Sequence, residues 1–280
     1  HEVAQHDGVR SQRYKLMYFH RTREWNLFDL QEDPNEMRSV HDDPAYAEIL
    51  AELKQRLIDQ REFYGVNFAT IPATRGDEQW WRDRNRQKNE QAREGGFELA
   101  FIGDSITQGW EGAGKNVWNE RFGSIKALNL GFGGDRTEHV IWRLDHNQLG
   151  PNKPKVAVVM IGTNNTGHLM QEPAQVADGV ERILELLAEK TPDTKVLLMG
   201  VFPRGQSPFD KGRLNNNGIN QRIRRLADGE RVHYMDISNQ FLEADGTISK
   251  TIMPDYLHLS EEGYRRWADA IAPKLAELGM

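Results

Sequence analysis

A serine, a histidine and an aspartate stand where acyl-transfer chemistry could use them. Ser105 lies in Gly-Asp-Ser-Ile-Thr, directly after an apolar stretch, while Asp255 and His258 share the segment Asp-Tyr-Leu-His. Acyl transfer needs a nucleophile, a base that takes its proton and a carboxylate that orients the base. We expect Ser105, His258 and Asp255 to fill these roles in that order.

Two segments rich in glycine and asparagine could stabilise the oxyanion that such a reaction forms. They are Gly131–Asp135 (Gly-Phe-Gly-Gly-Asp) and Gly162–Asn165 (Gly-Thr-Asn-Asn). The backbone N–H groups of Ser105 and Gly134 and the side-chain amide of Asn164 can donate hydrogen bonds to an oxyanion. Gly134 suits this role because a glycine lets the backbone come close to a substrate.

The elements that would position these residues alternate between strands and helices from residue 77 onward. Short apolar runs predict strands at Phe97–Ile102, Ala127–Leu130, Val156–Ile161, Lys195–Met199 and Val232–Ile237. Helical spacing predicts helices at Val117–Phe122, Thr137–Leu144, Pro173–Glu189, Lys211–Leu226 and Glu261–Leu278. This pattern predicts an α/β fold, a three-layer, doubly wound, parallel five-stranded sheet of the flavodoxin-like kind. Ligands bind beyond the carboxyl ends of such strands, where the candidate residues would meet.

The first 64 residues differ from the rest in their pattern of apolar residues, and this pattern predicts a small α+β module. Strand-like runs cover Tyr14–Phe19 and Trp25–Leu30, and an amphipathic helix follows Asp43-Pro44, a good N-cap with proline at the first helical position. Residues 65–76 show no periodicity and are interpreted as a linker to a second domain, residues 77–280.

Composition excludes several classes of function. The chain has 280 residues, no cysteine, and 36 basic against 42 acidic residues, a net charge of −6. Cysteine-ligated metals and cysteine nucleophiles are excluded, and the acidic balance disfavours nucleic-acid binding. The longest apolar run, Val156–Ile161, is too short for a membrane-spanning helix, so we expect no membrane insertion. No residue cluster indicates a metal site, and the proposed chemistry needs no cofactor.

Several segments together resemble the SGNH (GDSL-type) serine hydrolases. Within that family, the resemblance is to the platelet-activating-factor acetylhydrolases and their bacterial esterase relatives, and it covers Trp80 to Leu278. The segments that carry it are Asn129–Asp135, His139–Leu144, Gly162–Asn165, Pro203–Gly205 and Asp255–Ser260. The resemblance implies the same roles for Ser105, Asp255 and His258, with Ser105, Gly134 and Asn164 forming the oxyanion hole. It also implies that Ile106, Thr163 and Leu257 wall a shallow acyl pocket; Ile106 departs mildly from the Leu or Met common there.

The N-terminal module resembles the C-terminal end of a bacterial sulfatase. The likeness rests on Gly8–Leu16, Trp25–Leu30, Asp33-Pro34 and Asp42–Tyr46. The sulfatase signature, Cys or Ser followed by x-Pro-x-Arg, is absent from the sequence, so we expect no sulfatase activity. The resemblance suggests that the chain is the C-terminal part of a sulfatase–esterase fusion, and it favours a periplasmic or secreted bacterial location.

The sequence therefore predicts a serine esterase for short-chain, acetyl esters, acting on O-acetylated carbohydrate, with or without sulfate groups. One alternative is a lipid or lysophospholipid acyl hydrolase, and another is a non-catalytic module that binds carbohydrate or protein. The expected partner is a small-molecule or polysaccharide ester, and a homodimer stays open.

Overall fold

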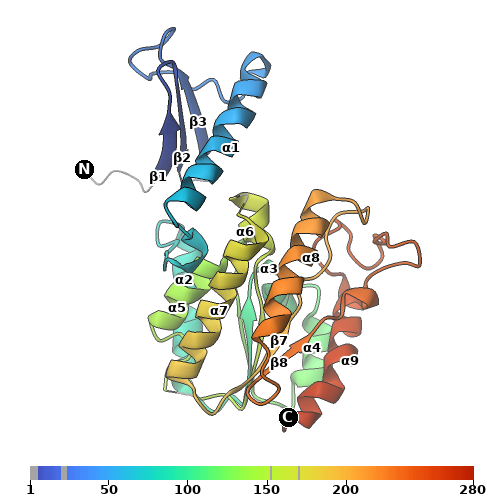
Figure 1. The fold of residues 1–280 in the computed structure, drawn as a ribbon. Coiled ribbons are helices and arrows are strands. Elements are labelled where there is room, and N and C mark those ends of the chain that lie inside the picture. The colour runs from blue at the N-terminus through green and yellow to red at the C-terminus, as the bar shows by residue number, and fades with distance from the viewer. Residues whose placement is uncertain (1–5, 20–23, 152, 170) are drawn as a thin grey trace. The chain divides into compact units, whose positions relative to one another are not determined.

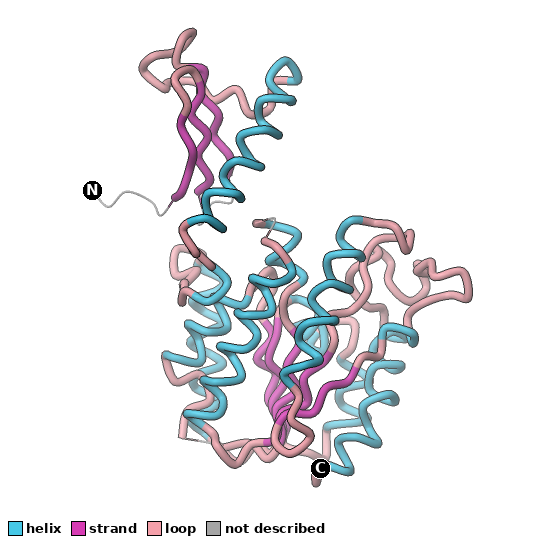
Figure 2. Tube along the Cα trace, viewed as in Figure 1, coloured by secondary structure: helices cyan, strands magenta, loops and turns pink. Residues whose placement is uncertain are grey.

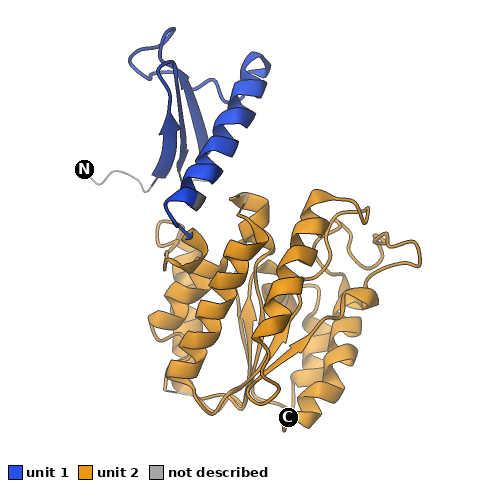
Figure 3. Cartoon of the chain, in the orientation of Figure 1, with its two compact units in different colours: residues 1–67 blue, residues 68–280 orange. Residues whose placement is uncertain are grey.

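The chain forms two compact units, which Figure 3 colours separately. The computed structural model describes residues 6–19, 24–151, 153–169 and 171–280. The first unit spans His1–Asn67 and the second Phe68–Met280. The division lies close to the end of the predicted N-terminal module, but inside the segment that was expected to be a linker.

The first unit is a three-stranded antiparallel sheet with one helix packed on it. Strands β1 (His6–Arg10), β2 (Tyr14–Phe19) and β3 (Glu24–Asp29) are followed by helix α1 (Ala47–Phe63). Asp43 caps the short 3₁₀ turn before α1, as its side chain accepts from the Ala45 N–H. The unit's small core consists of Val9, Leu16, Leu27, Leu53 and Leu57. Strand β1 was not predicted, because only one of its side chains is buried.

The second unit is built on a parallel sheet of five strands, as the sequence predicts. Its strands are β4 (Leu99–Gly103), β5 (Ala127–Gly131), β6 (Val156–Met160), β7 (Lys195–Met199) and β8 (Val232–Met235). Their spatial order is β5-β4-β6-β7-β8, and every neighbouring pair is parallel. Because the order reverses at β4, the connections that leave β4 and β6 separate there, which is where doubly wound sheets bind ligands.

Helices cover both faces of this sheet (Figures 1 and 2). Helices α5 (Thr137–Asp145), α7 (Pro173–Lys190) and α8 (Lys211–Ile223) pack on one face, while α4 (Lys115–Phe122) and α9 (Glu261–Glu277) pack on the other. Successive side chains of β4 alternate between the two cores: Ala100 and Ile102 join the first, Leu99 and Phe101 the second. Both faces are therefore apolar, which explains the continuous apolar strands. No helix in the described part of the chain is long and apolar enough to cross a membrane.

Residues 68–76 belong to the second unit and are not a linker. They include a 3₁₀ turn at Phe68–Thr70, and Ala69 is fully buried, with its carbonyl accepting from Thr137 Oγ1 at 2.8 Å. Helix α2 (Gln79–Glu94), which was not predicted, follows them. Its sequence is polar almost all round, with Trp81, Lys88 and Ala92 its buried residues, so it offered little apolar periodicity.

Short helices follow β4 and β6 directly and bring side chains to the carboxyl edge of the sheet. Helix α3 (Ser105–Gln108) begins two residues after β4, and α6 (Thr163–His168) begins three residues after β6. Helix α3 crosses the end of β5 so closely that Gly131 has no room for a side chain. A Cβ there would lie 2.1 Å from the Gln108 nitrogen and 2.5 Å from the Thr107 carbonyl carbon.

Substituting Gly131 should therefore loosen this crossing. Because the contacts are with backbone, which cannot rotate away, Gly131→Ala should lower the free energy of unfolding by about 1–3 kcal/mol. Urea unfolding measures the change. Gly76→Ala is the matched control, because its added Cβ would meet only the Thr74 side chain, at 3.2 Å or more. A Gly131→Ala protein as stable as the control would contradict this packing.

Candidate active site

Ser105 is the first residue of α3 and follows a tightly packed turn at residues 103–104. Asp104 caps the helix, with its Oδ1 accepting from the Ile106 N–H at 3.0 Å. A Cβ on Gly103 would lie 2.2 Å from Thr107 Oγ1 and 2.4 Å from the Met160 oxygen. The chain can turn this sharply only because residue 103 is glycine, and the turn leaves the Ser105 side chain partly exposed at the sheet edge.

The three residues predicted for acyl transfer form one hydrogen-bonded chain. Ser105 Oγ lies 2.9 Å from His258 Nε2, and His258 Nδ1 lies 2.6 Å from Asp255 Oδ2. A carboxylate only accepts hydrogen bonds, so Asp255 holds the proton of the neutral imidazole on Nδ1. Nε2 is then free to accept from the Ser105 hydroxyl, which is the arrangement a general base needs.

Asp255 is fixed by the backbone that follows it as well as by the imidazole. Its Oδ1 accepts from the N–H groups of Leu257 at 3.1 Å and His258 at 2.7 Å. Desolvation alone would raise the pKa of Asp255, but the hydrogen bonds from the His258 ring and backbone outweigh it and lower that pKa. Asp255 therefore stays ionised at neutral pH and keeps the imidazole oriented.

The loop that follows β5 presents the N–H group of Gly134. Gly134 has a left-handed backbone, with φ of 71°. The neighbouring N–H groups of this loop, at 131, 132, 133 and 135, are all taken by acceptors on Asn129, Gly103, Gln108 and Phe132, respectively. Among the described residues, the Gly134 N–H meets no acceptor, so it remains available to a substrate oxygen.

Asn164 is held against the same loop. It is the second residue of α6 and is 6% exposed, and its Nδ2 donates to the Asp135 carbonyl at 2.9 Å. This bond uses one of the two amide hydrogens and fixes the side-chain orientation. The second hydrogen remains for another acceptor. Through this bond Asn164 lies against Asp135, the residue that follows Gly134.

A buried carboxylate and three arginines hold this loop in place. Asp135 is 0% exposed; its Oδ2 accepts from Arg143 Nε at 2.9 Å, and its Oδ1 accepts from Arg75 Nη1 at 3.1 Å. Arg75 also donates to the Gly133 carbonyl at 2.6 Å, and Arg84 of α2 donates to the Gly131 carbonyl at 2.8 Å. Because arginines bind its carbonyls and its carboxylate, the loop is a preorganised element rather than a mobile turn.

Sequence reasoning missed Arg75 and Arg84 as parts of the site. Arg75 was assigned to a linker and Arg84 to a segment with no assigned structure. Arg75 pairs with Asp135, 60 positions away, and such a distance carries no periodic signal. The spacing of Trp81, Lys88 and Ala92 fits one face of a helix and could have revealed α2.

The residues expected to wall the acyl pocket fall into two groups. Ile106, 1% exposed, belongs to the core cluster beneath α4 and α9, and Leu257 packs against that same cluster. Thr163 is also 1% exposed, but its hydroxyl accepts from Arg204 Nη1 at 3.1 Å and from Asn216 Nδ2 at 3.2 Å. The structure thus brings Ile106 and Leu257 to one apolar cluster and engages the Thr163 hydroxyl in a polar one.

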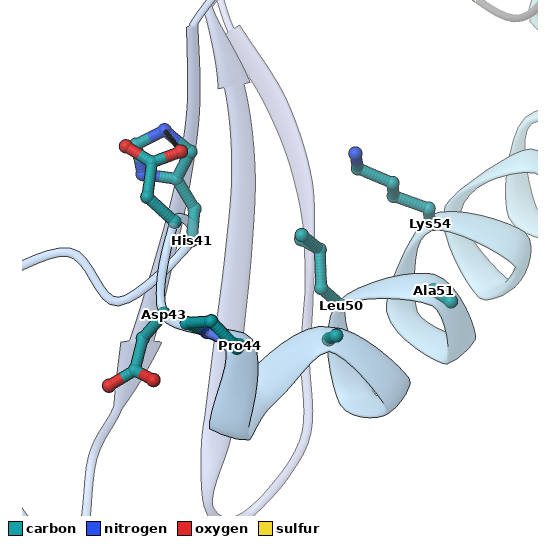
Figure 4. Close-up of a pocket in the computed structure, with 8 residues that line it drawn as sticks. His41, Asp43, Pro44, Leu50, Ala51 and Lys54 are labelled. Carbon is teal, nitrogen blue, oxygen red and sulfur yellow. Dashed lines mark ion pairs between the residues drawn. The ribbon is translucent and has the colours of Figure 1, made fainter.

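A separate pocket lies in the first unit (Figure 4). Its volume is about 320 Å³, and the lining residues are His41, Asp42, Asp43, Pro44, Ala47, Leu50, Ala51 and Lys54. The Lys54 ammonium lies 4.6 Å from the centre of the Trp25 ring. The pocket combines one lysine with two carboxylates, so its lining is slightly acidic and does not favour an anionic ligand. Among the described residues, no three His, Asp or Glu side chains gather in a way that could hold a metal ion.

Asp104, next to Ser105, gives the fold a distinctive pH dependence. Burial raises the pKa of this carboxyl to about 7, although the Ile106 N–H and His258 oppose the shift. In the unfolded chain an aspartate ionises near pH 4. The folded protein therefore holds a proton that the unfolded chain releases between about pH 4 and 7, and its stability falls as the pH rises through that window.

Asp104→Asn should remove this contribution, because asparagine keeps the oxygen that accepts from Ile106 but does not titrate. We compare the free energy of unfolding of the two proteins and take the difference, wild type minus variant. This difference should decrease from pH 4 to pH 7 by at most about 1.4 kcal/mol per pH unit, and level off above pH 8. Denaturant unfolding across this range measures it. A difference that does not vary with pH would show that Asp104 is ionised throughout.

Comparison with known proteins gives two family matches. Residues 101–266 match the model of the GDSL-like Lipase/Acylhydrolase family, and residues 1–63 match that of the N-sulphoglucosamine sulphohydrolase C-terminal region. The chain is 43% identical over 168 residues to platelet-activating factor acetylhydrolase IB subunit alpha1 of Bos taurus, covering 60% of this chain and 70% of the relative. It is 37% identical over 205 residues to subunit alpha2 of the Rattus norvegicus enzyme, covering 71% and 86%, respectively.

Solved structures share the fold of the second unit. A GDSL-like lipase from Bacteroides thetaiotaomicron superposes with a TM-score of 0.56 at 17% identity, covering 70% of this chain and 97% of the other. A carbohydrate acetylesterase from Sinorhizobium meliloti gives 0.53 at 20% identity, covering 65% and 100%. At these identities the likeness shows the fold.

Proposed function

This chain belongs to the GDSL-like lipase/acylhydrolase family of esterases, and we propose that Ser105, His258 and Asp255 are its nucleophile, base and orienting carboxylate. The observation that carries the proposal is the continuous hydrogen-bonded chain from Ser105 Oγ through His258 to Asp255, with distances of 2.9 and 2.6 Å. Ser105 begins α3, whereas Asp255 and His258 share a loop that starts 150 positions later.

In this mechanism Ser105 Oγ attacks the ester carbonyl while His258 Nε2 takes the hydroxyl proton. The tetrahedral oxyanion accepts hydrogen bonds from the N–H groups of Ser105 and Gly134 and from the Asn164 amide. His258 then gives its proton to the departing alcohol, and Ser105 keeps the acyl group. A water molecule, deprotonated by His258, attacks the acyl-enzyme, releases the acid and restores Ser105.

A series of alanine variants tests these assignments with nitrophenyl acetate. Ser105→Ala should lower kcat by about 10⁴-fold or more, because the triad acts as a unit. Asn164→Ala removes one oxyanion donor and should lower kcat by about 10²–10³-fold. Ser238→Ala, a serine in another loop of the same unit, should match wild type. Activity above a few per cent in Ser105→Ala would overturn the proposed nucleophile and leave a non-catalytic or differently built site.

For the substrate, we propose an O-acetylated carbohydrate of the kind that can also carry sulfate. Two findings support it: the fold is shared with a carbohydrate acetylesterase, and residues 1–63 match the C-terminal region of a sulphohydrolase that acts on a sulfated sugar. The second candidate is a lipid acyl hydrolase. It is favoured by the similarity of this chain to subunits of platelet-activating factor acetylhydrolase. Comparing kcat/KM on acetylated glycans and on phospholipid acetates separates the two.

For the acyl group, we propose a short chain such as acetyl. Ile106 and Leu257 pack on a core cluster that is already filled, so a longer chain would overlap them rather than gain about 0.8 kcal/mol for each buried CH₂. Across a nitrophenyl series from acetate to octanoate, kcat/KM should be highest for acetate and fall steeply by butyrate. Leu257→Ala should shift the preference toward longer chains. A wild-type maximum at hexanoate or beyond would contradict the short pocket and favour the lipid candidate.

A further inference from the structure

Arg204 is a half-buried cation beside the candidate active site, and the mechanism does not use it. It follows β7 in the segment Pro203-Arg-Gly205, and its Nη1 donates to the Thr163 carbonyl and hydroxyl, each at 3.1 Å. Within the described residues, no carboxylate lies within ion-pair distance of its guanidinium. A guanidinium has five N–H donors, so the remaining donors, on Nη2 and Nε, have no protein acceptor there.

The backbone around Arg204 joins the two halves of the site. On one side, Arg204 holds Thr163, the residue before Asn164. On the other side, the Gly205 N–H donates at 2.8 Å to the carbonyl of Tyr256, which lies between Asp255 and His258. The segment Arg204–Gly205 is therefore linked through Thr163 to the helix that carries Asn164, and through Tyr256 to the loop that carries His258.

Two glycines lie next to the Arg204 side chain. A Cβ on Gly167 would lie 2.9 Å from its Nη1, and a Cβ on Gly212 would lie 2.9 Å from its Cδ. The Arg204 carbonyl also accepts from Arg213 Nε at 2.9 Å. The two glycines thus leave room for the side chain, because a Cβ at either position would press on it.

The electrostatic surroundings leave room for an anionic ligand. Burial lowers the pKa of Arg204, and the carboxylates of Asp104 and Asp255 act in the opposite direction from a distance. Burial raises the pKa of Asp104 to about 7, so that its carboxyl is only partly ionised at neutral pH, and Asp255 is engaged by His258. A partly desolvated cation without a close counter-ion is unfavourable, and an anion bound to it would relieve that cost.

We propose that Arg204 binds a tetrahedral oxyanion group, a sulfate or phosphate, carried by the ester substrate near the scissile acetyl group. The planar guanidinium fork matches two oxygens of such a group. The site would then select anionic acetyl esters over neutral ones of the same size. This inference rests on the esterase function proposed above and adds the substrate's charge to it.

The test compares kcat/KM on a sugar acetate that carries a sulfate, on the same sugar acetate without it, and on an acetylated glycerophosphate. We expect the wild-type enzyme to prefer the sulfated over the neutral acetate, and Arg204→Gln to reduce that ratio by roughly 10- to 100-fold, as for the loss of a hydrogen bond to a charged group. Arg204→Lys keeps the charge but loses the fork, and should retain part of the preference. The glycerophosphate arm shows whether a lipid-type phosphate is preferred to a sugar sulfate.

Arg182→Gln is the matched control, because it removes one positive charge from the exposed surface of α7 and should leave the ratio unchanged. Equal losses on the sulfated and neutral acetates in Arg204→Gln would overturn the proposal and make Arg204 a support for Thr163 only. Should that variant fail to fold, inhibition of wild-type nitrophenyl acetate hydrolysis by the sulfated, unacetylated sugar decides; no inhibition would refute the anion site. Hydrolysis that survives Ser105→Ala would refute the proposed nucleophile while leaving the charge ratio measurable.

Discussion

The buried carboxylate of Asp135 is the constraint on which the candidate site depends. Fully enclosed, it accepts hydrogen bonds from Arg143 Nε, Arg75 Nη1 and Trp81 Nε1 at 2.9, 3.1 and 2.9 Å. Removing any one of these partners would leave part of a buried charge unpaired, which costs several kcal/mol in a protein interior. The loop after β5 therefore has one arrangement in which its charges are satisfied, and that arrangement presents the Gly134 N–H.

The same residue positions both proposed oxyanion donors that lie outside the Ser105 loop. Its side chain anchors the loop of Gly134, while its backbone carbonyl accepts from the Asn164 amide at 2.9 Å and sets the direction of that side chain. Arginines meanwhile bind the carbonyls of Leu130, Gly131 and Gly133. Donors that are oriented before the reaction need no reorganisation when charge develops, and this is the main source of stabilisation that such a site can offer.

The sequence predicted the parts of the site that follow from local pattern and from sheet geometry. Apolar strands ending in polar loops placed Ser105, Asn164 and His258 at one edge, because parallel strands share their carboxyl ends. It did not predict the role of Arg75, because that role depends on a partner 60 positions away. Nor did it predict α2, because the helix is polar almost all round and has three buried residues. It also placed Thr163 in the acyl wall without anticipating that Arg204 and Asn216 would engage its hydroxyl.

The two carboxylates that organise the site differ in burial, and the difference matches what each must do. Asp255 and His258 have side chains that are 57% and 44% exposed, whereas Asp135 and Arg143 have side chains that are 0% exposed. An imidazole that takes up and releases a proton in each turnover must change charge without a large desolvation penalty, which access to water and substrate allows. A pair that holds a loop must keep its charges constant, and exclusion of water strengthens that attraction. The fold therefore places the imidazole of the proposed proton transfer where water can reach it, and the ion pair that holds the loop where water cannot.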